Sequence, residues 1–139
     1  MTSRLLGIDP GTKRCGIAVT NSGQTMAFPR PVILNDETLL DRVTTIIDEE
    51  SIGGIVIGRP ISLAGNDTQS TLMADGLFHA IRVRFHTLEV TQWDERLTTL
   101  EAQKSLSQAG LRVKDHRERV DSAAAVIMLQ NYIDALHSD

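Results

Sequence analysis

The sequence predicts an α/β fold, one domain built on a five-stranded mixed sheet with helices on both faces. Its 139 residues are the usual size of a single domain, and no repeat or linker divides residues 1–139. Apolar runs in the first quarter are short and are separated by turn residues. Later apolar runs alternate between strand-like and helix-like spacing, which is typical of strand–helix–strand units that build a parallel sheet.

The N-terminal part is expected to form three antiparallel strands. The first two cover residues 5–9 and 15–20, and the Pro-Gly turn between them is far too short for the crossover helix that parallel strands need. A third strand is expected over residues 27–34. Pro29 and Pro31 favour a place at the sheet edge for it, because proline has no N–H to donate to a central ladder.

The remaining chain is expected to add two parallel strands through right-handed crossovers, the strong default for such units. Apolar residues recur at helical spacing over three stretches, and β-branched runs lie between them. Two glycines at 53 and 54 are expected to end the first helix, and a capping-box pattern at 98–101 to open the third. In chain order the elements are helix 38–50, strand 55–58, helix 68–85, strand 88–93, a helix opening at 98 and a last helix over 118–136.

Composition excludes some classes of protein and leaves others open. No stretch approaches the roughly 18–20 apolar residues of a membrane helix, and the N-terminus lacks a signal-peptide pattern, so we expect a cytoplasmic protein without membrane contact. The net charge of −4 does not indicate nucleic-acid binding, but basic residues do cluster over 112–119. The single cysteine, Cys15, excludes an internal disulfide, and we interpret it as a small apolar filler rather than a reactive thiol.

Three acidic residues stand at informative places. Asp9 ends the first strand, Glu95 follows the fifth, and Asp121 begins an apolar stripe of the last helix. Functional groups of mixed α/β sheets gather at the carboxyl ends of the parallel strands, so Asp9 and Glu95 can converge there. A charge at the head of an apolar stripe is costly unless it is paired, and a cation is one way to pair it.

Converging carboxylates suit a hard cation, and we expect Mg²⁺ or Mn²⁺, bound as a two-ion site. No zinc-binding pattern of cysteine or histidine is present. Each acid also has a structural interpretation: Asp9 as a turn residue, Glu95 as a helix N-terminal charge, and Asp121 as an ion-pair partner of Arg117. Glu118 is a candidate fourth ligand, although an ion pair with a neighbouring arginine is the simpler interpretation.

A second hypothesis rests on the turn after the first strand. Residues 7–12, Gly-Ile-Asp-Pro-Gly-Thr, match the first phosphate motif of actin-like and sugar-kinase-like ATPases, in which backbone amides of a turn can hold phosphates. Those ATPases enclose the nucleotide between two such domains, and this chain offers one. The sequence has no Walker-type phosphate loop.

Four motifs in order resemble a known family. They are Gly7–Arg14 with Gly16–Val19, Ile55–Pro60 with Gly65, Asp94–Ala102, and Val120–Ala125 with Leu129 and Gln130. They resemble the bacterial family named "putative pre-16S rRNA nuclease" or "putative Holliday junction resolvase", and the resemblance covers nearly the whole chain. It implies a ribonuclease-H-like fold with Asp9, Glu95 and Asp121 as the acidic triad. It also implies a role in maturing the 5′ end of 16S rRNA or in cutting branched DNA.

Two positions depart from the family pattern. Arg59 stands where members usually carry leucine, and Cys15 where they usually carry an aliphatic residue. Neither change touches the triad. Because Arg59 follows a strand at the active edge, we expect it to add a phosphate contact.

The sequence therefore predicts a metal-dependent endonuclease in which Asp9, Glu95 and Asp121 hold the ions. We expect nucleic-acid contacts from six basic residues: Lys13, Arg14, Arg59, Arg96, Lys114 and Arg117. The favoured substrate is precursor 16S rRNA, met within ribosomal precursor particles, and the second is a four-way DNA junction. A nucleotide-binding regulator and a non-catalytic nucleic-acid-binding module remain as alternatives of other classes. A monomer and a homodimer both remain open.

Overall fold

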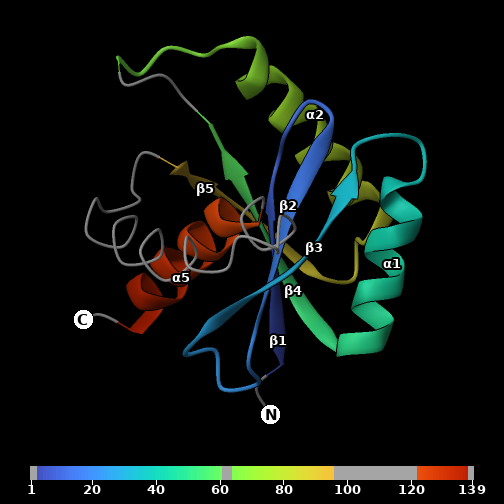
Figure 1. Ribbon diagram of the computed structural model, residues 1–139, viewed down its shortest axis with the longest axis vertical. Helices are drawn as coiled ribbons and strands as arrows, with labels where there is room; N and C mark the ends of the chain where they lie inside the picture. Colours follow the sequence, from blue (N-terminus) through green and yellow to red (C-terminus); the bar gives the residue numbers. More distant parts are fainter. Residues whose placement is uncertain (1–2, 61–63, 96–121, 138–139) are drawn as a thin grey trace, which may run out of the picture.

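A five-stranded mixed sheet forms the centre of the structure, a computed structural model that describes residues 3–60, 64–95 and 122–137 (Figure 1). The strand order is β3-β2-β1-β4-β5, with antiparallel pairing among the first three strands in sequence and parallel pairing of β1, β4 and β5. This confirms the predicted sheet. The strands are β1 (Arg4–Asp9), β2 (Arg14–Thr20), β3 (Ala27–Leu34), β4 (Ile52–Arg59) and β5 (Glu89–Asp94).

Helices cover both faces of the sheet, as the sequence predicted (Figure 1). Helices α1 (Leu39–Glu50) and α2 (Gln69–Arg84) lie on one face, and α5 (Ala123–His137) lies on the other. Alternate residues of a strand point to opposite faces, so Ile55 and Ile57 join the core under α1 and α2, whereas Val56 joins the core under α5. Over residues 55–59, the odd-numbered residues of β4 therefore face α1 and α2, and the even-numbered residues face α5.

Strand β3 lies at one edge of the sheet, which confirms the interpretation of its two prolines. Its pairing with β2 shifts in register between Cys15 and Ile17. The irregularity leaves room for a side chain to enter the ladder.

Strand β4 is longer than predicted, because it begins at Ile52 and includes Gly53 and Gly54. Helix α1 instead ends through Ser51, whose φ of 55° is left-handed. The glycines serve close packing: a Cβ on Gly54 would lie 2.9 Å from Leu5 Cδ2, and one on Gly53 would lie 1.9 Å from Ser3 Oγ. The two glycines that the sequence suggested as a helix stop are therefore part of β4, where they allow Ser3 and Leu5 to pack closely.

Helix α2 begins with a capping box, in which Thr68 and Thr71 each accept from the other's backbone amide; the sequence did not predict it. The capping box predicted at 98–101, the helix after it and the expected start of the last helix lie outside the described residues. Over the described ranges, none of the helices is long and apolar enough to span a bilayer.

Candidate active site

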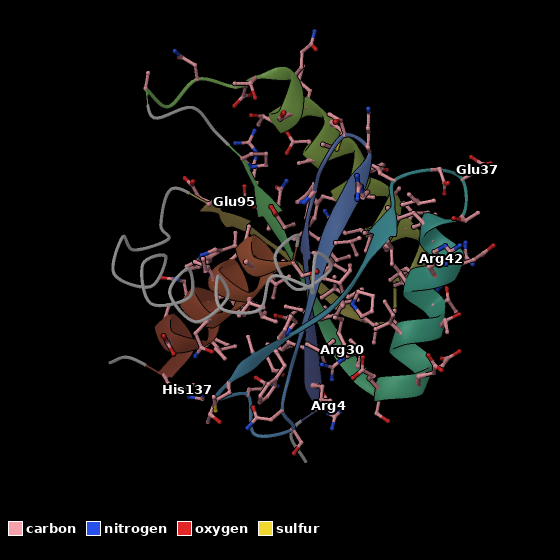
Figure 2. All side chains as sticks on the ribbon, in the orientation of Figure 1. Arg4, Arg30, Glu37, Arg42, Glu95 and His137 are labelled. Atoms are coloured by element: carbon pink, nitrogen blue, oxygen red, sulfur yellow. The ribbon has the colours of Figure 1, made fainter. Side chains whose placement is uncertain are left out.

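Three parallel strands end together at one edge of the sheet. Asp9 ends β1, Arg59 ends β4, and Asp94 ends β5 directly before Glu95. Figure 2 shows Glu95 at the carboxyl end of β5, and its carboxyl group hydrogen bonds the side chain of Asp9. The structure therefore brings together two of the three acids singled out from the sequence.

Both acids lie on the face of the sheet that α5 covers. Asp9 shares strand parity with Gly7, against which Leu129 of α5 packs. The Glu95 carboxyl lies over Gly58, where a Cβ would come within 2.4 Å of Glu95 Oε1. A glycine at the end of β4 thus makes the space in which Glu95 approaches Asp9.

Without a cation, the surroundings of the acidic pair disfavour a negative charge on Glu95. Burial, the hydrogen bond to Asp9 and the negative charges of Asp9 and Asp94 together raise the pKa of Glu95 to about 9. At neutral pH the Glu95 carboxyl therefore holds a proton. A divalent cation between the two carboxylates would replace that proton, and the donors are the hard oxygens that Mg²⁺ and Mn²⁺ prefer.

Asp121, the third predicted acid, lies outside the described residues, but the residue after it is described. Ser122 is fully buried, and its Oγ accepts a hydrogen bond from the Ile17 amide at 3.1 Å and donates one to the Arg30 carbonyl at 2.6 Å. Ile17 follows Gly16, the cross-strand partner of Asp9. The chain thus enters α5 one strand away from Asp9.

An open cleft of about 330 Å³ adjoins Asp9. Lys13 and Arg14, both exposed, line it together with the β1–β2 turn. The turn is tightly folded, because a Cβ on Gly11 would lie 2.2 Å from the Arg14 carbonyl oxygen. Two of the predicted phosphate-binding residues therefore stand beside an acid of the site.

Arg59 is held on the opposite face of the sheet from the acids, since its parity is opposite to that of Gly58. Its Nε donates to Asp75 Oδ1 at 2.8 Å, and its Nη2 lies 3.1 Å from Asp75 Oδ2 and 3.3 Å from Asp67 Oδ1. Gln92 of β5 donates to the same Asp75 at 2.7 Å. Its phosphate contact stays a prediction, and a phosphate would compete there with two carboxylates.

The other predicted site residues cannot be placed. Arg96, Lys114, Arg117 and Asp121, with Glu118 as the candidate fourth ligand, lie outside the described residues. Within the ranges 3–60, 64–95 and 122–137, no three His, Cys, Asp or Glu side chains gather to hold a metal ion. The described part of the site is a pair of acids.

Cys15 is fully buried in the core under α1 and α2, which confirms its interpretation as an apolar filler. Burial raises the pKa of its thiol, and a hydrogen bond with the Gly11 backbone opposes that effect only partly. A thiol in this state is a poor nucleophile.

Comparison with known proteins agrees with this geometry. Residues 3–135 match the model of the family RuvX, described as "Holliday junction resolvase". Similar curated proteins carry the name "Putative pre-16S rRNA nuclease". One from Bartonella tribocorum is 37% identical over 96% of this chain and 88% of its own, and one from Maridesulfovibrio salexigens is 36% identical over 94% and 97%.

Solved structures share the fold at low sequence identity. Thermus thermophilus RuvC in complex with a Holliday junction substrate has a TM-score of 0.64 at 14% identity, and covers 96% of this chain and 95% of its own. The fowlpox virus resolvase with its junction DNA has a TM-score of 0.59 at 11% identity, over 97% and 99%. The fold is therefore ribonuclease-H-like. With a family model that spans nearly all of its residues, the chain belongs to the RuvX family.

Proposed function

We propose that this protein is a metal-dependent endonuclease that hydrolyses phosphodiester bonds in precursor 16S rRNA. The contact between Asp9 and Glu95 at the carboxyl edge of the sheet carries the proposal. Half-buried carboxylates that face each other are costly unless a proton or cation lies between them, so the pair needs a structural or chemical reason. Membership of a nuclease family supplies the chemical one.

Asp9, Glu95 and Asp121 would hold the ions. Divalent cations supply Lewis acidity and make bound water a nucleophile at neutral pH. The chain's own contribution is placement: Gly58 leaves room for Glu95, and Ser122 anchors the start of α5 on the sheet. Asp121 precedes that anchor by one residue, which supports its place in the same cluster.

Lys13 and Arg14 would bind the phosphate backbone next to the cut, because they share a cleft with Asp9. Contacts of this kind supply affinity without reading sequence. Arg96, Lys114 and Arg117 would extend the basic surface along a flanking strand. Net acidity of the whole chain is compatible with this, since basic residues need to gather only near the cut.

The test is cleavage by Asp9→Asn, compared with wild type in Mg²⁺ or Mn²⁺. Asparagine keeps the shape of Asp9 but removes the charge, so we expect cleavage to fall by at least about a hundredfold. Asp134→Asn is the matched control, because Asp134 is an exposed carboxylate farther along α5 whose described partner is Gln130. Undiminished cleavage by Asp9→Asn would overturn the site assignment.

A four-way DNA junction is the second candidate substrate. The family description and two structural neighbours with junction DNA favour it. One preparation should be assayed on precursor rRNA and on a synthetic junction. Resolvases cut two strands symmetrically as dimers, so paired cuts by a stable dimer would move the assignment to DNA.

The nucleotide-binding alternative predicts that ATP shifts the melting temperature. We expect no shift, because the cleft beside Asp9 is lined by the β1–β2 turn and by residues of β1, β2 and β3 rather than by two enclosing domains. Wild-type cleavage that depends on a cation separates the enzyme from a non-catalytic binding module.

A further inference from the structure

Asn35, the residue directly after β3, is joined to the β1–β2 turn by two hydrogen bonds. Its side-chain Nδ2 donates to the Gly11 carbonyl at 2.7 Å, and its backbone amide donates to the Lys13 carbonyl at 2.9 Å. The same Nδ2 lies 3.6 Å from Met73 Sδ on α2. Asn35 therefore connects the turn to β3 and α2 at once.

The turn that Asn35 holds needs such support. Residues 10–13 lie between β1 and β2 and belong to neither strand, so the sheet ladder does not fix them. Lys13 is exposed within this turn and faces the cleft beside Asp9. Figure 1 shows that the β1–β2 turn and the end of β3 lie at the same end of the sheet.

We propose that Asn35 is a positioning residue for substrate binding, which holds the β1–β2 turn so that Lys13 stands beside Asp9 before nucleic acid arrives. The inference rests on the proposed role of Lys13 in phosphate binding. A lysine on a loose turn must be ordered when it binds, and that ordering subtracts from affinity. By fixing both carbonyls that flank Thr12, Asn35 removes part of the ordering before binding.

The side chain acts as a hydrogen-bond donor. Gly11 presents a carbonyl, which accepts, so a residue at 35 without an N–H or O–H cannot replace the bond. Asn35→Leu has nearly the same size, lacks the donor and can still pack against Met73. It complements Asn35→Ala, which leaves a gap, and both variants should behave alike if the donor matters.

The experiment measures binding of a fluorescent single-stranded RNA oligonucleotide in Ca²⁺, and separately kcat and KM in Mg²⁺. We expect Asn35→Ala and Asn35→Leu to raise the dissociation constant and KM by about threefold to tenfold, with kcat nearly unchanged. The double variant Asn35→Ala/Lys13→Ala should bind no more weakly than Lys13→Ala alone, because Asn35 acts through Lys13.

Asn21→Ala is the matched control. Asn21 holds the β2–β3 turn at the other end of β2, where its Oδ1 accepts from the Thr25 and Met26 amides at 2.9 and 3.1 Å. Its loss should lower the melting temperature to a similar degree as the loss of Asn35. It should leave KM and oligonucleotide binding at wild-type values.

Two results would overturn the proposal. One is oligonucleotide binding by both Asn35 variants within twofold of wild type. The other is a double variant whose loss equals the product of the two single losses, which would mean that Asn35 and Lys13 act separately. Wild-type cleavage decides the proposed function, whereas the binding comparison decides Asn35, so the two can fail independently.

Discussion

Gly58 lies directly beneath the Glu95 carboxyl. Because glycine carries a hydrogen where alanine carries a methyl group, this one residue makes room for the acidic pair. A Cβ there would be 2.4 Å from Glu95 Oε1 and 2.9 Å from Glu95 Cδ. The obstructed atoms are the far end of a flexible side chain, so the chain can yield by turning Glu95 away. The cost would then fall on the geometry of the site rather than on folding.

We therefore predict that Gly58→Ala lowers cleavage by about a hundredfold, the effect of misplacing a catalytic group by about 1 Å. The denaturation midpoint should stay near that of wild type, since alanine suits a strand interior better than glycine does. Gly7→Ala is the matched control: its Cβ would lie 3.0 Å from Leu129 Cβ, inside the packed core under α5, and should destabilise the fold. Full activity in Gly58→Ala would contradict the placement of Glu95.

Secondary-structure elements are joined at the site by side chains that enter the backbone ladder. Ser122 bridges β2 and β3 at their register shift, where its hydroxyl takes both the Ile17 amide and the Arg30 carbonyl. Ile17 is fully buried, so its amide would otherwise have no partner. The start of α5 is thereby fixed against the strand pair that neighbours Asp9.

Ser122→Ala should destabilise the protein by about 1–3 kcal/mol, the cost of leaving buried polar groups unsatisfied. Urea denaturation measures it, and Ser70→Ala on the exposed first turn of α2 is the control, for which we expect little change. Equal midpoints for the two variants would show that water or a rearranged backbone replaces the Ser122 hydroxyl.

Asp75 connects three elements, because this residue of α2 accepts hydrogen bonds from Arg59 of β4 and from Gln92 of β5. The hydrogen bonds from Arg59 and Gln92 hold the pKa of Asp75 below its ordinary value of 3.8. A carboxyl group whose pKa is lowered by folding stabilises the folded state at pH values above its ordinary pKa. This contribution disappears as the pH falls through the folded-state pKa.

Arg59→Leu should therefore lower the denaturation midpoint at pH 7, and the difference from wild type should shrink as the pH falls below about 4. Arg84→Leu is the control: Arg84 pairs with Asp41, which is 79% exposed, and exposed pairs contribute little. A difference that stays constant down to pH 2 would assign the effect to lost packing of the Arg59 side chain instead of to its charge.

For the whole molecule, the sequence was sufficient where a pattern depends on the backbone alone. Short connections, proline positions and strand alternation predicted the sheet, its edge strand and the meeting of Asp9 with Glu95. Contacts between distant segments were out of reach. Asn35, Ser122 and Asp75 carry no signal of spacing or motif that reveals their partners, which lie 24, 105 and 16 residues away in the chain.

The same limit explains one expectation that the structure corrected and one contact, that of Arg59 with phosphate, that stays a prediction. Gly53 and Gly54 fit a helix stop by composition, and only the packing of Ser3 and Leu5 against them shows that they belong to a strand. Arg59 was expected to meet phosphate because it follows a strand at the active edge. Its parity turns it to the opposite face, and the carboxylates that it meets there come from α2 and the segment before it.

The acidic pair should also connect cation binding to the stability of the whole domain. Glu95 comes from β5 and Asp9 from β1, with β4 between them, so a cation held by both links two non-adjacent strands. A ligand that binds only the folded state stabilises it by about 2.7 kcal/mol at a hundred times its dissociation constant, which is several degrees in melting temperature for a domain of this size.

We therefore expect Mg²⁺ or Mn²⁺ to raise the melting temperature of wild type over that in chelator, and sodium chloride at equal ionic strength to have no such effect. Asp9→Asn should lose most of the rise, because one anionic ligand is gone, whereas Asp134→Asn should keep it. In Asp9→Asn without cation, Glu95 no longer faces a second carboxyl group. The folded state then needs less free energy to keep Glu95 protonated at neutral pH, so the melting temperature should equal or exceed that of cation-free wild type. A lower cation-free melting temperature in Asp9→Asn would mean that the hydrogen bond between Glu95 and Asp9 stabilises the fold by more than the raised pKa of Glu95 costs.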